Sequence, residues 1–249
     1  MRTLTVILAL LRGRMLAPLR PAPPSRPRPA RDGVAVAVVS VAAAVLAAAC
    51  NVGSPGGMVV GSGDVRSDTR TVAAFTAVSA GAGVQVHLSR GPQKVVATAQ
   101  PNILDVTRTE VSGSRLTVDT TSGYVSAQGI VVTISVPELT ALELSGGASA
   151  TGDTGSTPAF TVELTGGARA TLAGSTGRLT LTAGGGALPD LGGLRAKDAK
   201  VDLSGGVVGS VAVSGTLEGS ASGGVVLTLT SQPASTRVET SGGAVLRSP

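Results

Sequence analysis

Acidic side chains recur in phase along the second half of the chain. Four of them stand three residues before the first glycine of a Gly-Gly pair, namely Glu143, Glu163, Asp202 and Glu239. Thr182 and Ser220 hold the same position in the two remaining repeats. If the repeats stack, these side chains form an outward row with neighbours roughly 5 Å apart, and adjacent carboxylates can raise a pKa or attract a divalent cation. We take the four acids as a candidate ligand-binding row for a weak cation or a glycan, without a dedicated metal site; an ordinary solvated face is the alternative.

Other residue types that could carry catalysis are few. His87 is the only histidine, and in the alternating run 84–88 it shares the outward face with Gln85. No serine stands in a Gly-x-Ser-x-Gly elbow, so we predict a solvated strand histidine and no catalytic residue. Three basic residues that alternate with acids are predicted to lie in a solvated loop: Arg195, Lys197 and Lys200.

The composition excludes several classes of protein. A single cysteine can form neither an internal disulfide nor a Cys-cluster zinc site, and three aromatic residues cannot supply stacking platforms for single-stranded nucleic acid. The net charge of +5 comes from residues 1–49, which hold seven arginines and one acid, whereas residues 50–249 hold 13 Lys/Arg and 14 Asp/Glu. We therefore predict no nucleic-acid partner and no cofactor.

The N-terminal segment has the features of a secretory signal sequence. A Pro/Arg-rich stretch precedes an uncharged apolar run over 33–49, and small residues lead directly to Cys50. This arrangement resembles a bacterial lipoprotein signal, in which the cysteine is acylated, although Ala47 stands where a large aliphatic residue is usual. We predict a signal peptide or anchor helix over 1–49, starting at Met1 or Met15, lipidation of Cys50, and a Gly/Ser/Pro-rich tether over 50–62. A plain signal peptide or an uncleaved anchor are the alternatives.

The remainder, residues 63–249, contains an internal repeat. The first glycine of each pair falls at 146, 166, 185, 205, 223 and 242, in steps of 18 to 20 residues. Between the pairs, apolar and polar residues alternate, which is typical of short half-buried strands. We predict an all-β solenoid with about 19 residues per turn and nine or ten turns. A sandwich of antiparallel hairpins is the alternative, but its loops have no reason to recur in phase.

Several segments of this body resemble one bacterial family. They include Phe75-Thr76-Ala77-Val78, Pro101-Asn102-Ile103-Leu104-Asp105, Arg115-Leu116-Thr117-Val118 and Leu142-Glu143-Leu144-Ser145-Gly146. Their order is similar to that of the head GIN domain family, also called putative auto-transporter adhesin. The resemblance implies a right-handed parallel β-helix-like fold and an extracytoplasmic setting, and it supplies no catalytic residues.

Two hypotheses about function follow. The first is a non-enzymatic, lipid-anchored β-solenoid of the cell envelope, an adhesin or scaffold whose partners are the membrane and an envelope polysaccharide or surface protein. The second is a carbohydrate-active enzyme that uses the carboxylate row together with Arg169 or Arg178. In either case, strand edges left uncovered at the end of a solenoid would allow self-association.

Overall fold

The computed structural model describes residues 57–249. The predicted signal peptide or anchor helix, Cys50 and most of the predicted tether lie outside these residues. The chain divides into two compact units, residues 1–52 and 53–249, and the second is described here by itself. Strands make up 64% of the described residues, which confirms the all-β prediction.

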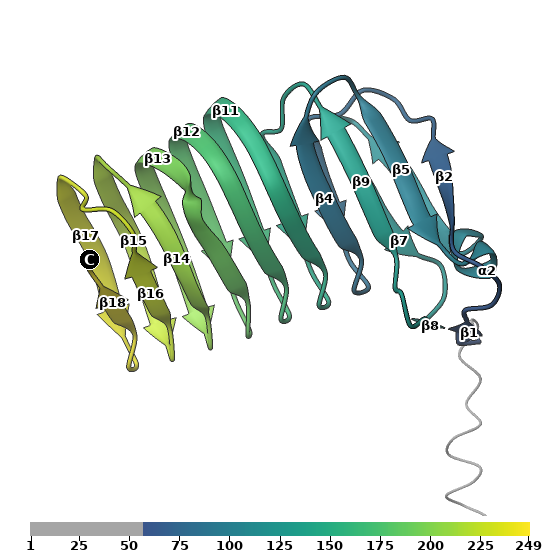
Figure 1. Ribbon diagram of the computed structural model, residues 1–249. Helices are drawn as coiled ribbons and strands as arrows, with labels where there is room; N and C mark the ends of the chain where they lie inside the picture. The colour runs from purple at the N-terminus through teal and green to yellow at the C-terminus, as the bar shows by residue number, and fades with distance from the viewer. Residues whose placement is uncertain (1–56) are drawn as a thin grey trace, which may run out of the picture. The chain divides into compact units, whose positions relative to one another are not determined.

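The second half of this unit is a stack of parallel coils. Its strands are β10 (Ala141–Leu144), β11 (Ser149–Leu164), β12 (Arg169–Ala183), β13 (Leu188–Gly205), β14 (Val208–Val213), β15 (Thr216–Gly223), β16 (Val226–Leu229), β17 (Ser235–Ser241) and β18 (Val245–Arg247). The long strands β11, β12 and β13 each run up one face, arc over the edge and return along the other face (Figure 1). Successive coils pair in parallel, so the body is a β-solenoid of about five turns and not a sandwich of hairpins.

The in-phase repeat is confirmed by the strand register. Thr161 pairs with Ala141, Thr180 with Thr161, and Lys200 with Thr180, so each coil repeats the step of the glycine pairs. The first glycines of the pairs lie above one another in space. A Cβ added at Gly205 would lie 2.9 Å from the Gly185 carbonyl oxygen, because the backbones of adjacent coils approach closely at this turn.

The first half of the unit is built differently. Its elements are β1 (Val59–Val60), β2 (Arg66–Arg70), β3 (Ala77–Ala80), β4 (Gln85–Arg90), β5 (Lys94–Ala99), α2 (Pro101–Leu104), β6 (Thr107–Ser112), β7 (Arg115–Thr120), β8 (Tyr124–Val125) and β9 (Val131–Val136). β6 pairs with β7, and β5 pairs with β2 and β9, all antiparallel. β3 joins the coils by pairing in parallel with β10, although 64 residues separate Ala77 from Ala141.

The prediction of nine or ten turns is therefore wrong. It extended the 19-residue step into residues 63–140, where Gly-Gly pairs are absent and antiparallel strand pairs occur together with parallel ones. The short helix α2 also departs from the all-strand pattern. It begins at Pro101, whose ring suits the first turn of a helix, and it buries Ile103 and Leu104.

The core is a narrow column of small and aliphatic side chains. Inward positions alternate with outward ones, so Val162 and Leu164 are fully buried while Glu163 between them is exposed. Among residues 57–249, Phe160 is the largest fully buried side chain. Since one buried cluster runs from Phe75 to Leu229, residues 53–249 have a hydrophobic core of their own and serve as the soluble body in the experiments below.

Two features at the start of the unit bear on the tether. Val59 and Val60, within the predicted tether over 50–62, form β1 and pair with β8. The Asn102 side chain donates to the Val60 carbonyl (2.7 Å) and accepts from the Ser62 amide (2.9 Å). These contacts attach residues 59–62 to the body. Between residues 57 and 249, no helix has the length and apolar character that a membrane span requires.

Candidate functional site

The structure brings the predicted carboxylate positions into one row on the outer face. Glu143 lies beside Glu163 on adjacent coils, and the register then runs through Thr182, Asp202 and Ser220 to Glu239. The side chains point outward because the residues flanking them, such as Val162 and Leu164, fill the core. At the other end, the row continues to Ser79 of β3, which lies beside Glu143.

The acids of this row have different surroundings. Glu143 forms an ion pair with Arg115. Asp202 accepts a hydrogen bond from the Ser220 hydroxyl (3.2 Å), and Thr182 separates it from Glu163. Glu143 and Glu163 are the one pair of acids in this row that lie on adjacent coils. No group of three or more metal-binding side chains occurs within 57–249. Ligand binding by the row stays a prediction.

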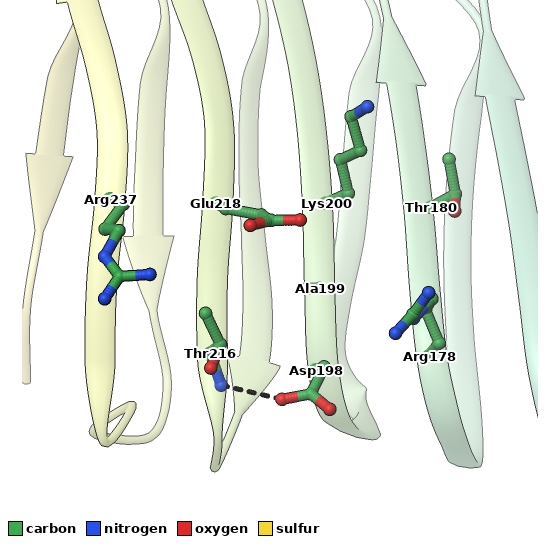
Figure 2. Close-up of a pocket in the computed structure, with 8 residues that line it drawn as sticks. All are labelled: Arg178, Thr180, Asp198, Ala199, Lys200, Thr216, Glu218 and Arg237. Atoms are coloured by element: carbon green, nitrogen blue, oxygen red, sulfur yellow. Dashed lines mark hydrogen bonds between the residues drawn. The ribbon is translucent and has the colours of Figure 1, made fainter.

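A second group of charged side chains lies in the two rows beside the carboxylates. These side chains line a depression of about 430 Å³, together with two threonines: Arg178, Asp198, Lys200, Glu218 and Arg237, with Thr180 and Thr216. Figure 2 shows these side chains on four neighbouring strands, β12, β13, β15 and β17. None of the four predicted acids lines this depression.

The register explains how these charges meet. On adjacent strands, Arg178 lies beside Asp198, and Lys200 lies beside Glu218. Glu218 in turn lies beside Arg237 on the next strand. The Thr216 amide donates to the Asp198 carboxylate at 2.9 Å and holds that side chain in place (Figure 2). The result is a half-enclosed surface that presents three cationic groups with two carboxylates between them.

Sequence reasoning missed this group. The Arg195–Lys200 segment was predicted to be a loop, which is wrong, because it lies within β13 and alternates between core and surface. Of the two arginines considered as partners for the carboxylates, Arg178 lies in the depression, whereas Arg169 pairs with Leu188 on the other sheet face. Applying the coil step to every outward position would have aligned Lys200, Glu218 and Arg237.

The two remaining polar residues of interest lie elsewhere. His87 is exposed on β4, and its Nδ1 shares a hydrogen bond of 2.9 Å with the Thr151 hydroxyl of the next coil. Tyr124 donates its hydroxyl to the Ala82 carbonyl (3.0 Å), and burial raises the pKa of Tyr124 above its ordinary value of 10.0. His87 thus links two strands that are distant in sequence, and Tyr124 links β8 to the turn between β3 and β4.

Parallel in-register coils with exposed polar rows define this chain as a β-solenoid protein. A family model for the putative auto-transporter adhesin, head GIN domain, matches residues 74–233, which is more than half of the chain. The chain belongs to this family, which confirms the resemblance noted in the sequence.

Solved structures agree on the fold. A putative adhesin from Bacteroides fragilis has a TM-score of 0.64 at 13% identity, with 77% of this chain and 100% of that chain covered. A putative adhesin from Parabacteroides merdae has a TM-score of 0.50 at 11% identity, with 77% and 99% covered. No curated protein matches the chain. At these identities the structural neighbours show the fold alone.

Proposed function

We propose that this chain is a non-enzymatic adhesion module of the cell envelope, held at a membrane through Cys50, that binds acidic polysaccharide on one face of its solenoid. The observation that carries the proposal is the depression lined by Arg178, Lys200 and Arg237. Guanidinium groups bind carboxylates through paired hydrogen bonds, and a lysine ammonium adds a point charge. Asp198 and Glu218 between them can accept hydrogen bonds from sugar hydroxyls.

The rigidity of the scaffold supports a binding role. Each charged side chain stands on a strand that is paired on both sides, apart from Arg237 on the last coil. Adjacent strands lie about 4.8 Å apart, so the cationic groups form a fixed array along the coils. An extended polymer can contact several coils at once, and this raises affinity without a deep pocket.

Binding can be tested with the soluble body, residues 53–249, on immobilised acidic and neutral polysaccharides. We expect retention on acidic polymers that falls with salt, and a loss of roughly tenfold in affinity for Arg178→Gln or Lys200→Gln. Arg169→Gln is the matched control, because Arg169 lies on the other sheet face. Equal binding by all four proteins, or retention only on a surface protein, would contradict the polysaccharide assignment.

The same samples test the enzymatic alternative. The soluble body is incubated with each polysaccharide and the chain length of the polymer is followed over time. We expect binding without cleavage. Turnover that disappears in Glu163→Gln would show that the carboxylate row is catalytic and would overturn the non-enzymatic proposal.

Anchoring through Cys50 needs a separate experiment with the full chain. We expect the protein in the membrane fraction with a lipid-modified cysteine at its N-terminus, detected by intact mass, because several acyl chains on one residue anchor firmly. Cys50→Ala should release or mislocalise the protein. An unmodified mature terminus would favour a plain signal peptide instead.

A further inference from the structure

The coil formed by β17 and β18 has one edge that no strand of the described residues covers. Within residues 57–249, β17 pairs only with β15, and β18 pairs only with β16. Inward positions also change character here: Leu217 and Ala221 are buried in β15, whereas their partners Thr236 and Thr240 in β17 are exposed. The outer edge of β17 therefore presents backbone amides, carbonyls and threonines that another strand could pair with.

The sequence of β17 is self-complementary. It reads Ser-Thr-Arg-Val-Glu-Thr-Ser over 235–241, the same in both directions except for opposite charges on the two sides of Val238. In an antiparallel pair of two such strands centred on Val238, each threonine faces a threonine, and Arg237 faces Glu239 twice. Residues directly opposite in an antiparallel pair lie on the same face and interact through their side chains.

We propose that β17 pairs antiparallel with β17 of a second copy of this chain, giving a tail-to-tail dimer. The pairing is isologous, so it closes at two copies and does not propagate into a fibre. Val238 would meet its counterpart on the core side, and the two Arg237–Glu239 pairs would lie on the outer face. Neither Arg237 nor Glu239 has an ion-pair partner within 4.0 Å in residues 57–249, so both are available.

This dimer needs neither bound polysaccharide nor acylation, although it uses Arg237, which also lines the depression of the proposed polysaccharide site. One consequence does depend on the proposed anchoring. β1, where the tether enters, lies at the end of the body opposite β17 (Figure 1). The two tethers would therefore leave from opposite ends of the dimer, so that it could connect two membranes.

The dimer can be tested by sedimentation velocity on residues 53–249 at about 0.1 M salt, with protein concentrations up to about 1 mM, where even a weak contact is populated. We expect a concentration-dependent dimer. Arg237→Glu and Glu239→Arg should each weaken it by roughly tenfold or more, because both cross-strand pairs become like-charged. Circular dichroism confirms that each variant keeps its strands.

The decisive measurement mixes the two single variants. In the mixture, an acid at one position again faces a base at the other, so a heterodimer should form although neither variant dimerises alone. The double variant Arg237→Glu/Glu239→Arg should dimerise like the original chain. Glu163→Arg is the matched control, since it changes the same row on an inner coil, and should have no effect.

Three results would overturn the proposal. The first is an original chain that stays monomeric throughout the concentration range. The second is single variants that dimerise as strongly as the original, which would place the interface elsewhere. The third is a mixture of the two single variants that fails to associate.

Discussion

The two glycines of one turn should differ sharply in their tolerance of a side chain. Gly205 has φ +81°, and a Cβ there would lie 2.9 Å from the oxygen and 3.2 Å from the nitrogen of Gly185. Gly206 has no left-handed φ, and a Cβ there would lie 3.5 Å from the Gly185 oxygen, which is ordinary contact. We therefore compare Gly205→Ala with Gly206→Ala.

The expected difference can be worked from these contacts. Alanine in the left-handed region costs about 1–2 kcal/mol. The clash at Gly205 must also push two coils apart and weaken the hydrogen bond from the Gly206 amide to the Gly185 carbonyl, a net loss of about 0.5–1.5 kcal/mol. Both alanines gain about 0.4–1 kcal/mol from the unfolded state. Gly205→Ala should then lower the free energy of unfolding by about 0.5–3 kcal/mol. Gly206→Ala should leave it unchanged or raise it by up to about 1 kcal/mol.

Urea unfolding of residues 53–249, followed by circular dichroism, measures both variants against the original chain. The denaturant dependence should stay unchanged, so that a shift in midpoint reports stability alone. The comparison cancels the unfolded-state term, because both positions receive the same side chain. Equal destabilisation of the two variants, or a larger effect at Gly206, would refute the argument that stacked first glycines set the distance between coils.

Three further predictions concern positions in the first half of the unit and in the core, each measured by urea unfolding. Ala82 has φ +52° at the first turn of the glycine stack, so Ala82→Gly should raise stability by about 0.5–1 kcal/mol, the strain removed exceeding the entropy lost; a decrease would contradict this. Tyr124→Phe should cost about 0.5–1.5 kcal/mol near neutral pH through loss of its hydrogen bond. Because its pKa is raised in the fold, the original chain should lose stability as pH rises above 10.0, and the phenylalanine variant should lack that loss. Phe160→Ala should cost about 3–5 kcal/mol, since the ring is fully buried, and a cost below that range would indicate that the coils close around the cavity.

Much of the solenoid could be predicted because glycine pairs mark each repeat at a nearly constant spacing. The first glycines of the turns, such as Gly166 (φ +63°) and Gly185 (φ +71°), adopt a left-handed backbone that disfavours any other residue, and this constraint appears in the sequence as a fixed spacing. The sequence pattern did not predict that Ala82-Gly83 forms the first turn of the stack, because alanine replaces the expected glycine there. The antiparallel strand pairs before β10 carry no such constraint, so extending the period into residues 63–140 gave too many turns.

The candidate surface was harder to predict than the fold. The carboxylate row was found because each acid has a fixed distance from a glycine pair. Lys200, Glu218 and Arg237 share no residue type, and only their register brings them together. A row of unlike charges does not stand out as a repeated residue type in the sequence. The spacing of the glycine pairs is nevertheless enough to locate it.

The outer rows stay in register although the coils differ in length, because the differences are absorbed at the arcs. Coils differ by up to two residues, yet adjacent coils remain aligned through each face. The register shifts fall at the arc between the faces, between Asp153 and Ser156 in one coil and between Thr171 and Ala173 in the next. A bulge there absorbs an extra residue without moving inward side chains to the surface, which a one-residue slip within a face would do. The faces can therefore hold a fixed array of charges while the arcs vary in length, and this separation makes the faces the natural place for a binding surface.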